Sequence, residues 1–195
     1  MVLTPSTMLP LGTRAPDFSL RDVQTGKTVK LADFAQKKAL VVMFICEHCP
    51  YVKHIAEGLS SFVRDYAARD VALVAISAND AKAHPDDAPE KLAAGARARG
   101  WKIAYLHDET QSVAKSYTAA CTPDFFLFDA QRKLVYRGQF DASRPNTAIP
   151  VTGADLRAAL EALLVGKPIA KEQKASLGCN IKWRAGNEPE YFGAR

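Results

Sequence analysis

The sequence has no apolar run long enough to cross a membrane. Its longest strongly apolar stretch is Ala39 to Cys46, far short of the roughly 18 residues that a membrane-spanning helix needs. A run of this length predicts a strand that is buried on both faces. Residues 1–11 also lack a basic stretch followed by an apolar core. We therefore expect no secretory signal, a cytoplasmic location and no membrane partner.

Cysteine is scarce, with four in 195 residues, and only Cys46 and Cys49 lie close together in the sequence. This count and spacing exclude the disulfide-rich scaffold of small secreted domains. The cysteines therefore indicate chemistry rather than a structural framework.

The chain also lacks a large excess of positive or negative residues. Lys and Arg number 26 and Asp and Glu 21, a net charge of +5, and the surplus is scattered, with a modest excess after Gly166. No recognition motif accompanies this charge, so we expect no nucleic-acid partner. With 48% hydrophobic and 24% charged residues, the composition is that of a soluble globular protein with a sizeable core.

Strand and helix patterns alternate along the middle of the chain. Residues 39–46, 71–77 and 102–106 predict strands, and 124–129 with 133–138 predict a β-hairpin. Helices are predicted from Tyr51 to Tyr66, from about Pro89 to Arg99, and over 109–119 and 155–164. Alternation implies parallel strands joined by right-handed crossovers, and the hairpin adds an antiparallel part. The sequence therefore predicts an α/β fold, a mixed central sheet flanked by helices.

A chain of this length fits one domain over residues 1–195. We expect an N-terminal β extension over 1–38, with a turn at Thr25-Gly26, and a core over 39–166. Residues 167–195, the C-terminal tail, show little helical periodicity. Neither end is large enough to fold alone.

The close cysteine pair lies at the predicted strand-to-helix junction, in the motif Cys46-Glu47-His48-Cys49. Backbone N–H groups and the helix dipole stabilise a thiolate at such a position, and an imidazolium at His48 would lower the pKa of Cys46 further. The spacing lets Cys49 reach back and resolve a mixed disulfide. We therefore predict that Cys46 is the attacking thiol, Cys49 the resolving thiol and His48 the residue that tunes them. Glu47 either tunes the thiolate or simply favours a helix N-terminus.

Two other interpretations of the cysteines remain open. They could be buried small hydrophobic residues, or half of a zinc site completed by Cys121, Cys179 or a histidine. Structural zinc sites with four cysteines usually take them from two closely spaced pairs, and neither Cys121 nor Cys179 has a second cysteine nearby in the sequence. His54, His84 and His107 lack ligand spacing. We therefore expect no metal and no cofactor.

A second motif, Cys121-Thr122-Pro123-Asp124, directly precedes an apolar strand. Proline is tolerated at the start of a strand because its missing N–H costs nothing there. From spacing alone Pro123 is a turn proline.

Four segments together resemble the thioredoxin-like members of the AhpC/TSA (peroxiredoxin-like) superfamily. They are Gly12-Thr13-Arg14-Ala15-Pro16-Asp17-Phe18-Ser19-Leu20, Phe44-Ile45-Cys46-Glu47-His48-Cys49-Pro50, Cys121-Thr122-Pro123-Asp124-Phe125-Phe126-Leu127-Phe128-Asp129 and Gly178-Cys179-Asn180-Ile181-Lys182-Trp183. The resemblance implies a thioredoxin-like fold in which Pro123 is cis and packs beside the dithiol. It also implies that Thr122 and Pro123 form the substrate-binding surface, with the backbone of Thr122 pairing a target strand.

The chain also departs from its relatives. Thioredoxins typically have Trp before the first cysteine and Gly-Pro between the two, whereas this chain has Ile45 and Glu47-His48. Peroxiredoxins typically have Thr three residues before a Cys-Pro nucleophile. Here Cys46 stands at that position, although the Cys49-Pro50 step is peroxiredoxin-like.

The sequence thus predicts a thiol–disulfide oxidoreductase that acts on protein or small-molecule disulfides and takes electrons from a thiol donor such as a thioredoxin system. One alternative is a thiol peroxidase with Cys49 as its nucleophile. The other is a non-catalytic binding module whose cysteines pack or hold metal.

Cys121 and Cys179 are candidate further redox residues. Cys179 either visits the dithiol on a flexible tail or packs with Ile181 and Trp183 to fasten the tail to the domain. Cys121, two residues before Pro123, is expected near the dithiol if the fold of the family holds.

Overall fold

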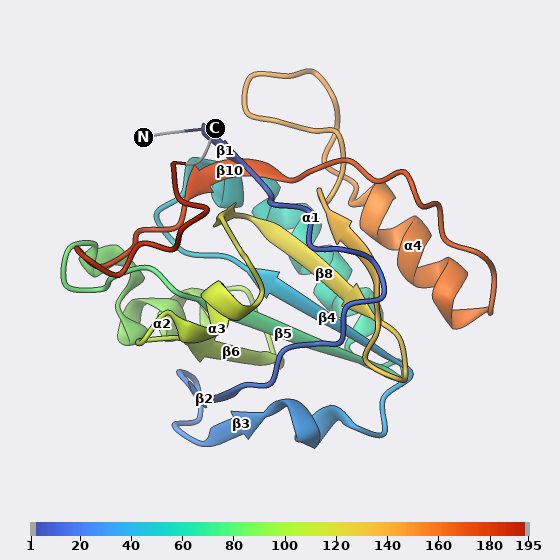
Figure 1. Ribbon diagram of the computed structural model, residues 1–195, viewed down its shortest axis with the longest axis horizontal. Helices are drawn as coiled ribbons and strands as arrows, with labels where there is room; N and C mark the ends of the chain where they lie inside the picture. The colour runs from blue at the N-terminus through green and yellow to red at the C-terminus, as the bar shows by residue number, and fades with distance from the viewer. Residues whose placement is uncertain (1–2, 194–195) are drawn as a thin grey trace.

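The computed structural model describes residues 3–193, which form two sheets and four α-helices (Figure 1). The larger sheet has seven strands in the order β3-β2-β6-β5-β4-β8-β9. Their bounds are β2 Ser19–Asp22, β3 Thr28–Lys30, β4 Ala39–Phe44, β5 Val71–Ser77, β6 Ala104–His107, β8 Asp124–Phe128 and β9 Leu134–Gly138.

The smaller sheet joins the two ends of the chain to its middle. It has the order β1-β10-β7, with β1 at Leu3–Pro5, β7 at Cys121–Thr122 and β10 at Leu177–Asn180. All its pairings are antiparallel. Figure 1 shows the first and last strands, blue and red, side by side.

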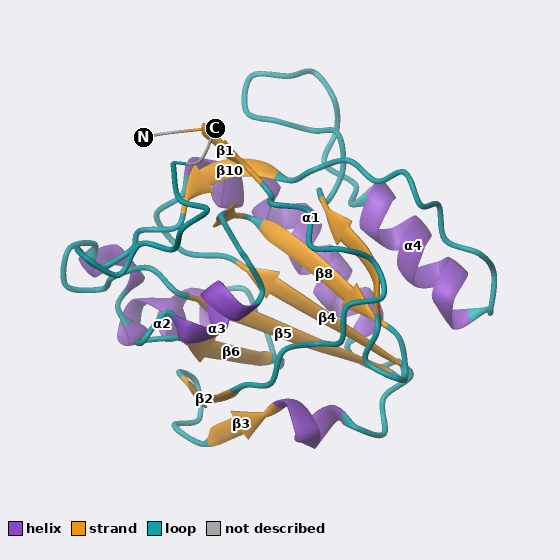
Figure 2. Cartoon of the chain, viewed as in Figure 1, coloured by secondary structure: helices purple, strands orange, loops and turns teal. Residues whose placement is uncertain are grey.

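The helices separate the strands in the predicted order (Figure 2). The four α-helices are α1 at Pro50–Tyr66, α2 at Pro89–Ala98, α3 at Ser112–Ser116 and α4 at Ala154–Leu164, and two short 3-10 helices are η1 at Leu31–Phe34 and η2 at Pro85–Asp87. Strands β4, β5 and β6 pair in parallel, whereas β8 and β9 form the antiparallel part. The predicted mixed sheet of a thioredoxin-like fold is confirmed.

Strand β4 divides the core because its side chains alternate between two apolar layers. Ala39, Val41 and Met43 face a layer built with residues of α1, α2 and α4. Leu40, Val42 and Phe44 face the other layer, which α3 and the N-terminal segment cover. Every residue of β4 is fully buried, which is why this run has no polar alternation in the sequence.

The N-terminal extension contributes β1, β2 and β3, in keeping with the predicted β extension. Two other parts of the fold differ from the sequence prediction. The C-terminal tail is not merely an appendage, because β10 forms the middle strand of the smaller sheet. This pairing joins distant segments, and local periodicity does not report it. Helix α3 is shorter than the predicted 109–119, because Gln111 adopts a left-handed conformation with φ 63° and Tyr117 ends the helix.

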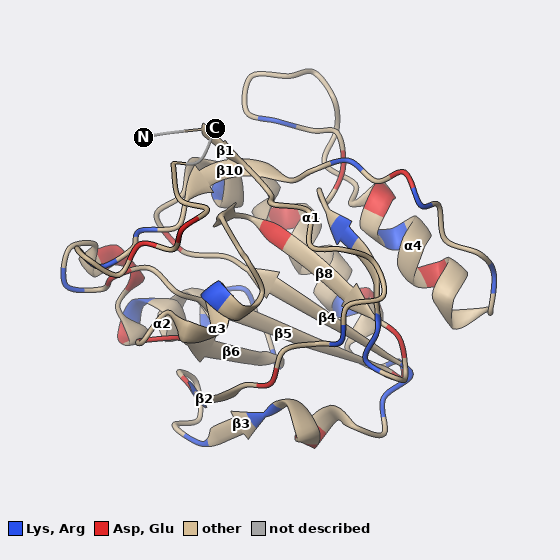
Figure 3. Cartoon of the chain, in the orientation of Figure 1, with Lys and Arg blue, Asp and Glu red and all other residues tan. Residues whose placement is uncertain are grey.

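Charged residues of both signs are interspersed over the helices and loops, whereas β4, β5 and β6 are largely free of them (Figure 3). Within residues 3–193, no helix has the length and apolarity that crossing a membrane requires.

Asp124 has a completely buried side chain at the start of β8, opposite Phe44. The Ser6 hydroxyl donates a hydrogen bond of 2.7 Å to Asp124 Oδ1. Burial raises the pKa of Asp124 to about 7, because desolvation disfavours the charged form. The acid is therefore held neutral over much of the acidic range in the folded protein.

We predict that Asp124→Asn removes a pH dependence of stability. An unfolded Asp ionises near pH 3.9, so between about pH 4 and 7 the folded state binds more protons and the free energy of unfolding falls as pH rises. Each pKa unit between the two states is worth about 1.4 kcal/mol. Denaturant unfolding at several pH values should show a flatter profile in Asp124→Asn. The exposed Asp70→Asn is the control, and equal slopes in all three proteins would contradict the prediction.

Candidate functional site

The Cys46-Glu47-His48-Cys49 motif occupies the predicted junction between β4 and α1. Cys49 is the N-cap residue of α1, with extended backbone angles, and Pro50 follows in the first turn. Proline suits this place because its fixed φ is helical and its missing N–H would have no helical partner. The amphipathic helix then buries its apolar face, Val52, Ile55, Leu59, Phe62, Val63 and Tyr66, against the sheet.

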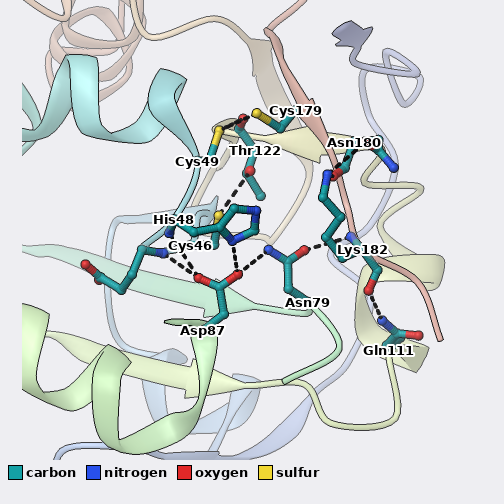
Figure 4. A network of polar contacts seen from close by, with 11 residues as sticks. Cys46, His48, Cys49, Asn79, Asp87, Gln111, Thr122, Cys179, Asn180 and Lys182 are labelled. Carbon is teal, nitrogen blue, oxygen red and sulfur yellow. Dashed lines mark hydrogen bonds and ion pairs between the residues drawn. The ribbon is translucent and has the colours of Figure 1, made fainter. Parts of the chain in front are cut away.

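Three sulfur atoms converge at the start of α1 (Figure 4). Cys49 Sγ lies 2.9 Å from Cys179 Sγ, longer than the roughly 2.05 Å of a disulfide, and Cys46 forms a hydrogen bond with Cys49. Thr122 touches both members of the motif, with its hydroxyl 3.4 Å from Cys46 Sγ and its carbonyl oxygen 3.2 Å from Cys49 Sγ. All three cysteines are buried.

Cys49, and not Cys46, is the more acidic of the two thiols of the motif. The pKa of Cys49 is lowered first by its hydrogen bond with Cys179 and then by its hydrogen bond with Cys46, with smaller contributions from the Thr122 side chain and the backbone N–H of Val52. The pKa of Cys46 is raised because its thiol donates to Cys49, because it is buried, and because Asp87 is negative. The predicted low pKa of Cys46 is therefore wrong.

Asp87, in η2, organises the motif although the sequence analysis missed it. Its Oδ1 accepts hydrogen bonds from the backbone N–H groups of Glu47 at 2.8 Å and His48 at 3.2 Å. Its Oδ2 lies 2.5 Å from His48 Nδ1 and accepts a 2.7 Å bond from Asn79 Nδ2. The carboxylate is fully buried, so these bonds hold both the backbone and the imidazole in place.

The signal for Asp87 was present in the order of the strands. Residues 78–89 follow β5, which pairs with β4 in parallel, so the carboxyl ends of both strands meet at one edge of the sheet. A polar segment at that edge lies beside the motif that follows β4.

Asn79 connects this cluster to the chain that follows β10. Its Oδ1 accepts a 2.8 Å hydrogen bond from the backbone N–H of Lys182, and Gln111 Nε2 donates to the carbonyl oxygen of Lys182 at 2.9 Å. Figure 4 shows these bonds in one network with Asp87. The C-terminal segment is therefore anchored at Lys182 through both its N–H group and its carbonyl oxygen.

Glu47 points away from the sulfur atoms toward α2. It forms an ion pair with Arg99, whose guanidinium lies 4.7 Å from the centre of the Trp101 ring. A Cβ at Gly95 would come within 2.6 Å of the Glu47 carboxyl group, so that glycine makes room for it. Glu47 therefore links the motif to the end of α2. This role differs from both roles considered from the sequence, which were tuning of the thiolate and stabilisation of a helix N-terminus.

A metal ion has one candidate position among residues 3–193. Cys46 Sγ, a ring nitrogen of His48 and a carboxylate oxygen of Asp87 lie within 4.8 Å of one another. An ion there would have to replace the hydrogen bond between His48 and Asp87. His48 also stacks on His84, with ring centres 5.3 Å apart and planes inclined by 9°.

The Thr122-Pro123 peptide bond is cis, as the resemblance implied. The main-chain edge of Thr122, however, is already occupied, because Cys179 in β10 is its partner in the antiparallel register. Pairing of a target strand with Thr122 stays a prediction, and it requires β10 to move.

The other two candidate redox residues are Cys179 and Cys121. Cys179 lies on a strand and not on a flexible segment, and it packs in the layer of Cys46 and Cys49. Ile181 and Trp183, its expected neighbours, belong to the opposite layer. The expected packing with Ile181 and Trp183 is therefore wrong, whereas the expected proximity of Cys179 to the dithiol is present without a flexible segment. Cys121 Sγ lies 3.7 Å from the carbonyl oxygen of Pro123.

Comparisons with known proteins agree on the family and the fold. The chain matches the model of the AhpC/TSA family over residues 11–137. It is 52% identical to an uncharacterized conserved protein from Geobacillus kaustophilus, with a TM-score of 0.92 over 94% of this chain and 97% of that one. Among curated proteins, no match was found.

Two more distant structures share the fold alone. One is peroxidoxin BcpB from Mycobacterium tuberculosis, with 21% identity, a TM-score of 0.58 and coverage of 80% of this chain and 96% of that one. The other is the thioredoxin domain of a thiol-disulfide oxidoreductase from Bacteroides vulgatus, with 17% identity, a TM-score of 0.55 and coverage of 77% and 99%.

We predict that Cys49 carries the thiolate of the reduced protein. The ultraviolet absorbance of thiolate, followed as pH falls, should persist well below pH 8.5 in wild type and in Cys46→Ser, because the donors of Cys179 and Val52 remain. The low-pH absorbance should vanish in Cys49→Ser. If the low-pH absorbance is lost in Cys46→Ser and kept in Cys49→Ser, then Cys46 carries the thiolate, as the sequence predicted.

We also predict that Asp87→Asn loosens the motif. The amide cannot accept every hydrogen bond that the carboxylate accepts, so unfolding should become easier by about 1–3 kcal/mol in denaturant titrations. The pKa of Cys46 should fall, because a negative charge that helps to raise it is gone. Asp86→Asn, at the exposed neighbouring residue, is the matched control. Unchanged stability and an unchanged pKa of Cys46 would show that Asp87 does not hold the motif.

Proposed function

Because the chain belongs to the AhpC/TSA family, we propose that it is a thiol–disulfide oxidoreductase that uses the Cys46/Cys49 dithiol. One observation carries the proposal. Two thiols, joined by a hydrogen bond, stand at the start of a helix beside a cis-proline, and one of them has a lowered pKa. Such a pair suits stepwise attack on a disulfide.

In the proposed reaction the Cys49 thiolate attacks one sulfur of a substrate disulfide. A bond forms between Cys49 and that sulfur, the substrate disulfide breaks, and its second sulfur leaves as a thiolate. Cys46 then loses its proton and attacks Cys49, which gives the Cys46–Cys49 disulfide and releases the first substrate sulfur as a thiol. These roles reverse those expected from the sequence.

Neighbouring groups suit the two steps. The hydrogen bonds around Cys49 stabilise its thiolate before the attack. They stabilise the sulfur less once it is part of a neutral disulfide. The raised pKa of Cys46 keeps this thiol protonated until the mixed disulfide removes the negative charge of Cys49. His48, fixed by Asp87, keeps an imidazole within 4.8 Å of Cys46.

Electrons return to the oxidised dithiol from a thiol donor such as a thioredoxin system. We propose a cytoplasmic setting for this cycle, because a reducing pool of thiols keeps such a dithiol reduced.

A thiol peroxidase is the second candidate, favoured by the low pKa of Cys49 and by the Cys49-Pro50 step at the helix start. In that reaction Cys49 would attack a peroxide and become a sulfenic acid, which a second thiol would resolve.

We predict that disulfide reduction exceeds peroxide consumption, because Cys46 stands where peroxiredoxins typically have threonine. Insulin reduction and hydrogen peroxide consumption should be measured with the same reductant. Cys49→Ser should lower insulin reduction to the rate of the reductant alone, and exposed Asp86→Asn should not. Saturable peroxide consumption that survives Cys46→Ser but not Cys49→Ser would favour the peroxidase instead.

A further inference from the structure

Strand β10 lies where a docked substrate strand would lie. It runs antiparallel to β7, with Cys179 opposite Thr122 and Asn180 opposite Cys121. Proteins often bind extended peptides by adding them as a strand to a free sheet edge. In this chain the edge beside the cis-proline is filled by the chain itself.

The fit of β10 against this edge depends on Gly178. A Cβ at Gly178 would lie 2.0 Å from the carbonyl oxygen of Thr122 and 3.2 Å from Pro123 Cδ, so any side chain would push the strand away. The Ser176 hydroxyl also donates a 2.5 Å hydrogen bond to the carbonyl oxygen of Pro123. The strand is therefore built for close approach to the Thr122-Pro123 pair.

Cys179 is the side chain that this strand presents to the thiolate. Its sulfur lies 2.9 Å from Cys49 Sγ, and the exposed fraction is 0% for Cys49, 1% for Cys46 and 2% for Cys179. With β10 in place, the attacking sulfur therefore meets an internal thiol before it meets any external partner.

We propose that β10 acts as an internal substrate strand and that Cys179 is a third redox-active cysteine, which forms a disulfide with Cys49. This inference rests on the proposed function, because the Cys46–Cys49 disulfide is its starting point. The Cys179 thiol gives up its proton and attacks Cys49. The bond between Cys49 and Cys179 forms, the bond between Cys46 and Cys49 breaks, and the electron pair and a proton end on Cys46. The step involves no net oxidation.

Charge favours Cys179 as attacker once Cys49 is in a disulfide. In the reduced protein the pKa of Cys179 is raised, first by its hydrogen bond to Cys49, then by burial and by the negative charge of Cys49. Oxidation of Cys49 removes the hydrogen bond to a thiolate and that charge, whereas the positive charge of Lys182, which lowers the pKa, remains.

The two disulfides have different consequences for access. A bridge between Cys46 and Cys49 stays within the motif and leaves β10 held only by non-covalent contacts. A bridge between Cys49 and Cys179 ties α1 to β10 and closes the edge of Thr122 to any target strand. The position of the disulfide therefore controls access to the site.

The test is to map disulfides after mild oxidation with diamide, quenching in acid and alkylation. In Cys46→Ser, where diamide supplies the oxidation that the Cys46–Cys49 disulfide supplies in the wild type, we expect an intramolecular Cys49–Cys179 bridge that protects both thiols. Adding Cys121→Ser as a matched control should leave the bridge intact. Adding Cys179→Ser instead should abolish it and let glutathione modify Cys49. A Cys179 that remains fully open to alkylation in oxidised Cys46→Ser would overturn the proposal.

A second variant tests the strand without touching a sulfur atom. Gly178→Ala should slow formation of the Cys49–Cys179 bridge and speed alkylation of Cys49, because the added Cβ forces β10 away from Thr122. Gly58→Ala, whose Cβ would meet the Val151 side chain at 2.6 Å, is the control for general strain. Bridge formation at the wild-type rate in Gly178→Ala would refute the proposal that β10 presents Cys179 to Cys49.

Disulfide mapping does not depend on catalytic turnover. A protein that forms the Cys49–Cys179 bridge but does not reduce insulin would therefore contradict only the proposed function.

Discussion

Four hydrogen bonds end on the buried carboxylate of Asp87, and they come from two backbone N–H groups of the motif, the imidazole of His48 and the amide of Asn79. A buried carboxylate is stable only when its oxygens are paired in this way. These bonds therefore stabilise the observed conformation of the loop from Cys46 to Cys49. Because Asn79 also binds the backbone of Lys182, the same carboxylate indirectly fixes the segment that follows Cys179.

The second organising feature is competition among three sulfur atoms for one negative charge. The charge is most favourable on Cys49 because its sulfur is hydrogen-bonded to two thiols and to a backbone N–H in the first turn of α1, and the pKa values of Cys46 and Cys179 are raised. A charge placed on the second cysteine of the motif distinguishes this site from one in which the first cysteine is the more acidic. Family membership alone does not reveal it, since the charge depends on Cys179, far along the chain.

The strand-to-helix junction could be predicted because the apolar run before Cys46 and the periodicity after Tyr51 are local signals. The cis-proline followed from resemblance. The pKa order, Asp87 and β10 could not be predicted, because each depends on contacts across the chain. Cys49 and Cys179 are separated by 130 positions, and a strand of four residues leaves almost no periodic pattern.

The position of β10 in the chain also affects how the protein matures. Every other described strand precedes β10 in the sequence, so β10 is the last of them to be synthesised. Because a domain generally folds as a unit, the native dithiol site cannot form until the segment that carries Cys179 is available. Before that point Cys49 lacks both the strand that buries it and its hydrogen bond with Cys179, so its thiol is exposed and less acidic than in the folded protein.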